Sequence, residues 1–519
     1  MLKPLPVSTF TLRDIIENGC LYIDKTQYIY ELIRYPKRTY FLSRPRRFGK
    51  SLLISTLHEI FRGNKDLFQN LWIHNSDYEW KVHPVIRIDF GQNTVNSAEK
   101  LEQVIDYYLE GIAEEYGLTI RGFDFQTRFQ DLIRQLARNN QVVILIDEYD
   151  KPMIDNIENI PEAKRIRDTL KAFYAVIKAM DAHLHMTFIT GISKFSQVGV
   201  FSALNNLVDL TMNTQFSSML GLTDAELRRD FAEYSTALAS ELGYTSEALH
   251  GEIRRWYDGF CFAPNGENVY NPYSVIHLFF QRRFFNHWFA TGTPTFLIKL
   301  IHAQNYDIVQ FDEVMLEEID FSTYELENLS VIPLLYQTGY LTLKGFTQEL
   351  GKEALYTLSY PNYEVEHAFR SYLISAFSYI ERTMARSYLR KLAAAIKEKD
   401  LDQVFSIMSV FFTNIPYDLQ LKYEQYYQSI LYTVFMMLGL DIEAEVETNE
   451  GRIDAVVELS DHILLFEFKI DKNAQEAPQQ IKENKYYEKY QLHNKEMTLI
   501  GANFNSQTRT VDDWISETN

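Results

Sequence analysis

The sequence predicts an α/β protein of several domains, with a parallel sheet in its N-terminal part and a smaller α/β domain at its C-terminal end. The chain has 519 residues and a typical domain has about 100 to 200, so one compact core is not expected. Between residues 39 and 212, short β-branched or aromatic runs alternate with helical stretches, as in a parallel sheet. From residue 421 onward, a helix leads into alternating strands and then a polar helix.

The predicted elements follow in three sections. The strands of the first and last sections are predicted at residues 39–43, 85–90, 142–146, 185–191, 207–212, 442–447, 452–458 and 462–468. The middle section is mostly helical, and Thr223 with Glu226 forms a capping box that opens one helix. We therefore predict three domains, at residues 1–216, 217–417 and 418–519.

Composition limits the classes of function. Hydrophobic residues make up 46% of the chain and charged residues 23%, which is typical of a globular protein rather than a disordered one. The 70 acidic and 51 basic residues give a net charge of −19, so any nucleic-acid site must be local. Cys20 and Cys261 are too few for a disulfide framework or a cysteine-rich zinc site. With no signal peptide or membrane-spanning stretch in view, we expect a cytoplasmic protein without a membrane partner.

A phosphate-binding turn is predicted between the strand at 39–43 and the helix that follows it. Gly49, Lys50 and Ser51 open this helix, where backbone N–H groups favour anions, a lysine reaches phosphates and a hydroxyl binds Mg²⁺. The match to the full P-loop pattern is partial, because Arg44 stands where that pattern has its first glycine. The residues predicted to bind ATP here are Arg46, Arg47, Phe48, Gly49, Lys50 and Ser51. Arg46 and Arg47 either neutralise phosphate charge or act as an arginine finger in cis.

A second motif supports a nucleotide site. The apolar run 142–146 is followed directly by Asp147 and Glu148, which is a Walker B pattern. We predict that Asp147, together with Ser51, holds Mg²⁺, and that Glu148 polarises the attacking water. The alternative is that these acidic residues merely end a strand.

Other strand ends of the same predicted sheet carry polar residues. Thr190, Ser193 and Lys194 end a later strand, where a sensor of the γ-phosphate would lie, and Ser193 is predicted to contact the nucleotide. Asp89 ends the strand at 85–90 on the same edge. The competing interpretation of all four residues is an ordinary strand-end turn or cap.

The last section carries a second candidate site. Glu467 and Lys469 lie two residues apart on a strand, so their side chains point to the same face. A hairpin with the preceding strand would bring Asp454 near Glu467. Two carboxylates can bind Mg²⁺ or Mn²⁺, and the lysine can orient the water that attacks a phosphodiester. An exposed cross-strand salt bridge would use the same residue types.

Neighbouring residues could complete this site. Glu445 lies on an earlier strand, at period two from Glu443 and Glu447. Gln480 falls early in the following helix. Glu424, on the helix that precedes the strands, is a further candidate metal ligand or water-orienting group, although a solvated helix face is the favoured interpretation. Residues beyond Gln480 that could also contribute are Lys485, Tyr486 and Tyr490.

These motifs carry a family resemblance over nearly the whole chain. In order along the sequence they are YIDKT (22–26), RPRRFGKSLL (44–53), LIDEYDKP (145–152), TGISKFS (190–196), YDGF (257–260), VYNPYSV (269–275), TGTPTFL (291–297), QTGYLTL (337–343), GRIDAVV (451–457) and FEFK (466–469). The chain resembles the bacterial and archaeal AAA-ATPase-like proteins that pair a degenerate P-loop domain with a C-terminal PD-(D/E)XK nuclease-superfamily domain. In that family an arginine at the position of Arg44 is usual, whereas Pro478 departs from its pattern.

The resemblance implies an AAA-type ATP-binding domain and a nuclease-like domain with Asp454, Glu467 and Lys469 as its catalytic residues. In the middle section, a predicted helix at 326–340 and two strands at 340–343 and 356–359 indicate a winged-helix module. Its helix has no Lys or Arg before Lys344, which favours a packing and relay role over nucleic-acid binding.

We expect an ATP-regulated, metal-dependent nuclease whose partners are ATP and nucleic acid. Two alternatives remain open. One is a nucleotide-dependent switch with a catalytically silent nuclease fold. The other is an ATPase that remodels a protein partner and assembles as a ring, so that a homo-oligomer is also open.

Overall fold

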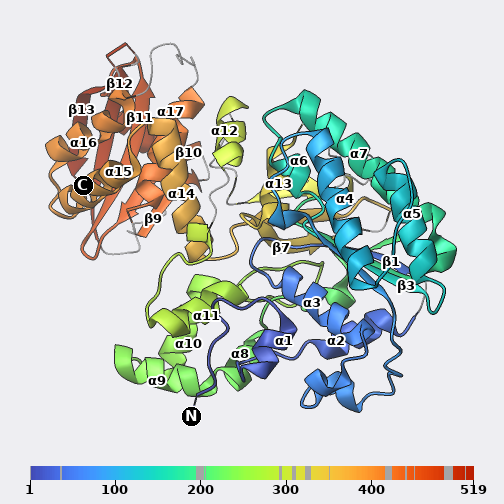
Figure 1. The fold of residues 1–519 in the computed structure, drawn as a ribbon. Coiled ribbons are helices and arrows are strands. Elements are labelled where there is room, and N and C mark those ends of the chain that lie inside the picture. The colour runs from blue at the N-terminus through green and yellow to red at the C-terminus, as the bar shows by residue number, and fades with distance from the viewer. Residues whose placement is uncertain are drawn as a thin grey trace. The chain divides into compact units, whose positions relative to one another are not determined.

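The structure is a computed structural model that forms two compact units (Figure 1). Unit 1 comprises Met1–Phe296 and Asp312–Val365, and unit 2 comprises Leu297–Phe311 and Glu366–Asn519. The predicted three-domain division stays a prediction. The structure describes residues 2–35, 38–194, 204, 206–291, 295–304, 306, 311, 313–321, 329–349, 351–414, 424–438, 441–448, 451–483, 495–505, 507–508 and 510–518.

Unit 1 is built on a five-stranded sheet in the order β2-β3-β4-β1-β5, and every neighbouring pair is parallel. The strands are β1 (Arg38–Ser43), β2 (Val85–Asp89), β3 (Val142–Asp147), β4 (Leu184–Gly191) and β5 (Leu207–Asp209). All six residues of β3 are buried, which explains its continuous apolar run. The predicted parallel sheet is confirmed, although β5 ends three residues earlier than expected.

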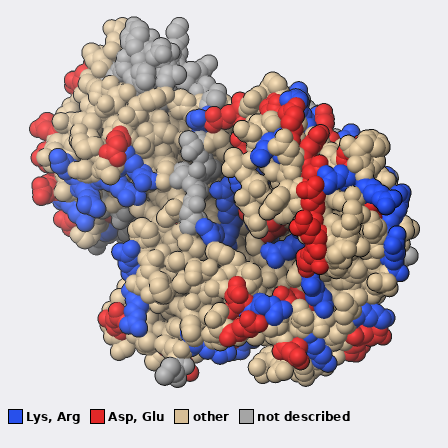
Figure 2. Space-filling view, in the orientation of Figure 1, with Lys and Arg blue, Asp and Glu red and all other residues tan. Residues whose placement is uncertain are grey.

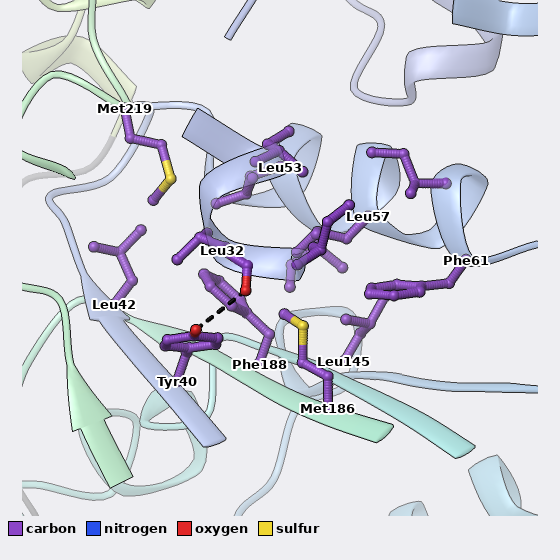
Figure 3. Close-up of a cluster of buried hydrophobic side chains, with 14 of the residues drawn as sticks. Leu32, Tyr40, Leu42, Leu53, Leu57, Phe61, Leu145, Met186, Phe188 and Met219 are labelled. Carbon is purple, nitrogen blue, oxygen red and sulfur yellow. Dashed lines mark hydrogen bonds between the residues drawn. The ribbon is translucent and has the colours of Figure 1, made fainter. Parts of the chain in front are cut away.

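Helices cover both faces of this sheet. On one face, α3 (Lys50–Phe61) packs through Leu53, Leu57 and Phe61 onto β-strand side chains such as Leu145 and Phe188 (Figure 3). Figure 3 also shows the Tyr40 hydroxyl, which donates a 3.1 Å hydrogen bond to the Leu32 carbonyl. The remaining helices of this part are α1 (Leu12–Glu17), α2 (Thr26–Ile33), α4 (Ala98–Glu115), α5 (Phe125–Leu136), α6 (Lys151–Ile154) and α7 (Ile160–Ala179). Because the core fixes α3, it also fixes the loop that precedes this helix.

A helical section follows the sheet within unit 1. Its helices are α8 (Asp224–Asp230), α9 (Ala232–Leu242), α10 (Ser246–Tyr257) and α11 (Pro272–Gln281). The predicted capping box is confirmed, because Thr223 and Glu226 exchange side-chain and backbone hydrogen bonds at the start of α8.

A small module completes unit 1. Helix α13 (Val331–Thr338) is accompanied by the antiparallel strands β6 (Val314–Glu317), β8 (Leu355–Ser359) and β7 (Thr342–Thr347) in that order. Residues 331–337 of α13 are all buried, so this helix cannot enter a nucleic-acid groove. This burial supports the packing part of the packing and relay role predicted for the helix, whereas the relay and the winged-helix module stay predictions.

Unit 2 holds a mixed sheet in the order β13-β12-β11-β10-β9, in which only β11 and β12 run parallel. Its strands are β9 (Asp441–Thr448), β10 (Gly451–Glu458), β11 (His462–Ile470), β12 (Glu496–Asn505) and β13 (Thr510–Thr518). The first three match the predicted strands within two residues at each end, whereas β12 and β13 were not predicted. The helices are α12 (Thr295–Ala303), α14 (Tyr363–Ser378), α15 (Arg382–Lys397), α16 (Leu401–Thr413), α17 (Glu424–Met436) and α18 (Glu476–Glu483), with the first residues of α12 and α14 belonging to unit 1.

The two faces of this sheet carry different helices. Phe466 of β11 contacts Phe405 of α16 and Phe435 of α17, with ring centroids 6.5 and 5.2 Å apart. On the other face, α18 lies against Gly501 of β12, where an added side chain would meet Ala477. Since side chains alternate along a strand, Glu467 and Lys469 belong to the α18 face.

Candidate functional site

The phosphate loop joins β1 to α3, and its backbone closes around one lysine. Lys50 Nζ donates hydrogen bonds of 2.9 Å to the carbonyl oxygens of both Arg44 and Pro45. Gly49 precedes the helix with a φ of 92°, which a residue with a side chain rarely adopts. Burial lowers the pKa of Lys50, against the opposing effect of nearby carboxylates such as Asp147. The loop thus offers a buried amine and the open N–H groups of a helix start, which together suit phosphate.

Arg44, which stands where the P-loop pattern has its first glycine, is buried inside unit 1 and fixes the phosphate loop through hydrogen bonds to backbone carbonyls. Its side chain is 1% exposed and donates hydrogen bonds to the carbonyl oxygens of Ser43, Thr211 and Phe216, at 2.8, 2.8 and 3.3 Å. The guanidinium lies 4.2 Å from the ring centroid of Phe262. Burial lowers the pKa of Arg44 to about 10. Arg44 therefore holds the loop in place from behind rather than contacting a ligand.

A cavity of ≈ 600 Å³ opens over the phosphate loop. The predicted ligands Arg46, Arg47, Gly49, Lys50, Ser51 and Glu148 all line it. The facing wall comes from α11, through Pro272, Tyr273, Ile276 and His277, and from the N-terminal segment that includes Thr9 and Phe10. The Arg47 guanidinium lies 4.9 Å from the centroid of the Tyr273 ring and so reaches toward this wall. The choice between charge neutralisation and an arginine finger stays a prediction for both arginines.

Asp147 is fully buried at the end of β3 and has one unused oxygen. Its Oδ1 accepts hydrogen bonds from Thr190 Oγ1 at 2.5 Å and from the Glu148 backbone N–H at 3.1 Å. Its Oδ2 has no hydrogen-bond partner among the described residues. A buried, unpaired carboxylate oxygen is costly unless a cation satisfies it, so Asp147 fits the role of a Mg²⁺ ligand.

Glu148 follows in a strained backbone conformation, with a φ of 51°, and its side chain lines the cavity. Burial raises the pKa of Glu148; nearby carboxylates, Asp147 first, add to the rise, and Lys50 opposes it. The Glu148 carboxylate lies against Gly91, where an added methyl group would overlap it. Asp89 Oδ1 accepts a 2.9 Å hydrogen bond from the Gly91 N–H, which fixes this turn. Gly91 thus leaves the space that the Glu148 carboxylate occupies, and no sequence pattern singled it out.

The polar residues at the end of β4 are engaged with other groups. Ser193 donates to Asp150 Oδ2 through both its hydroxyl, at 2.6 Å, and its backbone N–H, at 2.7 Å. Lys194 Nζ pairs with Asp209 at 2.8 Å, and its N–H donates to the Gln337 side chain. Neither they nor Thr190 are among the residues that line the cavity. The γ-phosphate sensor at Ser193 therefore remains a prediction. Asp150, which joins the ends of β3 and β4, lies in the acidic run that follows the predicted strand, but no role was predicted for it.

Phe48 faces a second, apolar cavity of ≈ 110 Å³ beside the first. The ring of Phe48 is buried in edge contacts with Phe260 and Phe262, at centroid distances of 4.8 and 5.3 Å. Both cavities are lined by Gly49, Leu52, Ile276 and three further residues, so they share a wall. A polar pocket for phosphates thus adjoins an apolar one.

A buried carboxyl group braces the nucleotide cavity from outside. Glu364 accepts hydrogen bonds of 2.7 Å from the Ser274 hydroxyl on α11 and from the Trp288 backbone N–H. The indole N–H of Trp288 in turn donates a 2.9 Å hydrogen bond to the Arg46 carbonyl in the phosphate loop. Burial raises the pKa of Glu364 to about 8. Both walls of the cavity are therefore tied to one residue near the start of α14, which no sequence motif singled out.

The second candidate site lies in unit 2, on the α18 face of the sheet. The register that pairs Ala455 with Phe466 puts Asp454 opposite Glu467, as the hairpin prediction required. Asp454 Oδ2 accepts a 2.7 Å hydrogen bond from the Phe468 N–H. These contacts bring the two carboxylates to the middle of the sheet.

The lysine of the motif belongs to the same group. Lys469 Nζ donates to Glu467 Oε1 at 2.9 Å and to Gln480 Oε1, on α18, at 2.5 Å. Asp454, Glu467, Lys469 and Gln480 therefore converge, and the lysine is held in one place. Because Glu467 is 3% exposed, the alternative of a solvent-exposed salt bridge does not describe this pair.

The electrostatics of this group favour a cation. Burial first, and then the charge of Asp454, raise the pKa of Glu467 to about 7. Glu467 Oε2 is buried and has no hydrogen-bond partner among the described residues. A divalent ion would satisfy this oxygen and offset the repulsion between the carboxylates, so the donor set fits Mg²⁺ or Mn²⁺.

The further predicted ligands are not placed by this geometry. Within the described part of the chain, no three His, Cys, Asp or Glu side chains gather as a metal site. The side chains of Glu424, Glu443, Glu445 and Glu447, and the whole of Lys485, Tyr486 and Tyr490, lie outside the described residues. Their predicted contributions stay predictions.

Comparisons with known proteins identify the domains in which the two candidate sites lie. Residues 4–201 match a family model described as "Predicted AAA-ATPase", and residues 422–514 match the PD-(D/E)XK nuclease superfamily. The chain is an AAA-ATPase-like protein with a C-terminal PD-(D/E)XK nuclease-superfamily domain. A relative from Azotobacter chroococcum mcd 1, named "Uncharacterized protein in vnfD 5'region", is 36% identical over 526 residues, which cover 99% of each chain.

The resemblance proposed from the motifs is therefore confirmed. The first matched region contains β1 to β4 and the phosphate loop, and the second contains Asp454, Glu467 and Lys469. In the described part of this AAA-ATPase-like protein, no helix is both long and apolar enough to cross a membrane.

Proposed function

We propose that this AAA-ATPase-like protein is an ATP-regulated, metal-dependent nuclease that cleaves phosphodiester bonds. One observation carries the proposal: Asp454, Glu467 and Lys469 converge in unit 2, and Glu467 has a buried oxygen left without a partner among the described residues. An unpaired buried acceptor is costly, and a divalent ion held by Glu467 would satisfy this one.

At the nucleotide site, the phosphates of ATP are proposed to lie against the start of α3. Lys50 would exchange its bonds to the loop carbonyls for bonds to phosphate oxygens, and the base would enter the apolar cavity beside Phe48. Ser51 and Asp147 would hold Mg²⁺, which neutralises phosphate charge when bound. Glu148 would orient the attacking water and accept its proton at a carboxylate oxygen.

At the nuclease site, Asp454 and Glu467 would hold a divalent ion, which supplies charge neutralisation at the scissile phosphate. Lys469 would orient the attacking water, and Gln480 keeps the Lys469 amine in position through its 2.5 Å contact.

We further propose that the protein works in the cytoplasm, since Cys20 and Cys261 are both free thiols.

Cleavage assays test the proposal directly. Labelled single- and double-stranded DNA and RNA are incubated with Mg²⁺ or Mn²⁺, with and without ATP, using wild type, Lys469→Ala and Lys472→Ala. Lys472 lies on the same segment and is exposed, so it serves as the matched control. We expect cleavage by wild type and the control and its loss in Lys469→Ala. Equal inactivity of all three proteins would overturn the nuclease proposal.

A second candidate function is a nucleotide-dependent switch with a silent nuclease fold. It is favoured by one observation: only two carboxylates converge among the described residues, which is few for a divalent ion that takes six or more oxygen ligands. Mn²⁺ binding, measured by isothermal titration calorimetry on wild type and Asp454→Ala, distinguishes the two functions. A silent domain should show no binding that depends on Asp454.

A further inference from the structure

Helix α15 of unit 2 has an unusual charge for a protein of net charge −19. It carries five basic residues and no acidic residue along its sixteen positions. Figure 2 shows basic side chains gathered over the part of unit 2 where Figure 1 labels α15. The basic residues are Arg382, Arg386, Arg390, Lys391 and Lys397.

Their spacing aligns most of them in a row. At about 100° per residue, Arg382, Arg386, Arg390 and Lys397 fall within an arc of about 80° on the helix. The buried side of the helix holds Leu389, Leu392, Ile396 and two alanines. We call the four aligned residues the basic ridge.

The basic ridge forms no ion pair within the described part of the chain, although two acidic cap residues, Glu381 and Glu398, flank α15. No carboxylate among the described residues lies within 4.0 Å of its charged groups. The nearest ion pairs along the sequence are those of Arg370 and Lys399, on either side of α15. By contrast, exposed arginines on helices of unit 1, such as Arg228 and Arg282, are paired with Asp224 and Glu241. The Arg382 guanidinium is instead stacked 4.5 Å from the Tyr372 ring centroid, which keeps it ordered without cancelling its charge.

The basic ridge lies on the side of the sheet opposite to the nuclease-like site. Helix α15 packs along α16, where the rings of Tyr388 and Phe411 are 6.2 Å apart. Helix α16 covers the Phe466 face of the sheet, and Glu467 belongs to the other face. The ridge is therefore a separate surface and not the rim of the catalytic group.

A row of arginines without carboxylate partners, at helical spacing, fits a chain of phosphate groups, because guanidinium groups bind phosphate in a bidentate way. An anionic membrane is a weaker candidate, since the apolar side of α15 is already buried and cannot enter the lipid. We propose that the basic ridge of α15 binds the phosphate backbone of the nucleic acid on which unit 2 acts. This inference rests on the proposed function, because it takes nucleic acid as the substrate.

Binding without cleavage tests the proposal. The full chain is titrated without divalent metal against a labelled single-stranded oligonucleotide of about 30 nucleotides, which is flexible enough to reach both faces. The test variant is Arg382→Gln/Arg386→Gln/Arg390→Gln. The matched control is Arg228→Gln/Arg229→Gln/Arg282→Gln, which removes the same charge from arginines that are already paired.

We expect the test variant to bind at least about tenfold more weakly at low salt. A plot of log K against log salt has a negative slope, and its steepness should decrease by about 2 in the test variant. Each of the three phosphates that the protein no longer neutralises accounts for about 0.7 of this decrease. The control should keep the wild-type slope. Thermal unfolding of all three proteins verifies that each is folded.

Three results would overturn the proposal: equal slopes for wild type and test variant, an equal loss of affinity in the control, or ridge-dependent binding to anionic vesicles but not to the oligonucleotide. The two proposals can fail separately. If oligonucleotide binding depends on the ridge but no cleavage occurs, nucleic-acid binding by the basic ridge is supported and the nuclease proposal is rejected. If cleavage is lost in Lys469→Ala but the salt slopes of wild type and test variant are equal, the nuclease is supported and the ridge proposal is rejected.

Discussion

At the scale of single residues, the reactive side chains depend on neighbours that leave them room. Gly91 is the clearest case, because the Glu148 carboxylate occupies the space that a side chain at 91 would fill. Glu148 is also the only residue of the Walker B pair with a strained φ. The position of this carboxylate is thus set by the backbone of the β2 turn.

We therefore expect Gly91→Ala to lower ATP hydrolysis by about tenfold or more while ATP still binds, because a displacement of about 1 Å at a catalytic group is costly. The matched control is Gly111→Ala in α4, where an added methyl group meets nothing within 4 Å. That control should be active and slightly more stable. Hydrolysis by Gly91→Ala at the wild-type rate would show that Glu148 does not need its present position.

The sequence predicted the reactive residues better than their supports. Lys50, Ser51 and Glu148 line one cavity, and Asp454 meets Glu467, because strand register and chain direction follow from hydrophobic patterning. The role of Arg44 could not be predicted, since its partners are backbone carbonyls as distant as Phe216. Such partners leave no local pattern in the sequence.

At the scale of elements, α11 and the first residues of α14, which both belong to unit 1, are joined at the nucleotide cavity by the buried carboxyl group of Glu364. Its pKa of about 8 compares with an ordinary value of 4.5, so the folded protein retains a proton that the unfolded chain releases between these pH values. The contribution of Glu364 to stability should consequently fall by at most about 5 kcal/mol as the pH rises from about 4.5 to 8, and level off above.

Glu364→Gln removes this titration and keeps one carbonyl acceptor for the hydrogen bonds. We expect the unfolding temperature of Glu364→Gln, relative to wild type, to rise steadily between about pH 5 and pH 8. Thermal unfolding followed by circular dichroism at several pH values measures it. Glu349→Gln, at an exposed position, is the control for the substitution itself. A difference between Glu364→Gln and wild type that stays flat across this pH range would contradict the assignment.

Strands β12 and β13 show where element prediction failed. Strand β12 includes Gly501 and Asn503, two residue types that are typical of turns. In the structure, Gly501 is needed because Ala477 and Pro478 of α18 lie against it. Packing between elements overrode local propensity here, and no single segment carries that information.

At the scale of the whole molecule, the two proposed activities belong to separate compact units and should be separable. We expect Lys50→Ala to weaken ATP binding by about tenfold to a hundredfold, because it removes one or two charge-assisted hydrogen bonds. The variant should retain basal cleavage, but this cleavage should not respond to ATP. Lys469→Ala should lose cleavage and still hydrolyse ATP.

Nucleotide binding by calorimetry, phosphate release and cleavage are measured side by side on both variants. If Lys50→Ala responded to ATP as wild type does, the proposal that ATP regulates cleavage through the nucleotide site would be wrong.

The overall class, an α/β chain with an AAA-type sheet and a nuclease-like domain, was predictable because ten motifs occur in order along it.

The indole of Trp288 gives this molecule a built-in optical probe. Its N–H is bonded to the Arg46 carbonyl, so any shift of the phosphate loop changes the polarity that this chromophore senses. The chain has five tryptophans, and among the described residues Trp288 is the one whose indole donates a hydrogen bond to that loop. Fluorescence emission should therefore change when ATP is added to wild type and much less in Trp288→Phe, so that loop movement can be timed in a stopped-flow instrument without any attached dye.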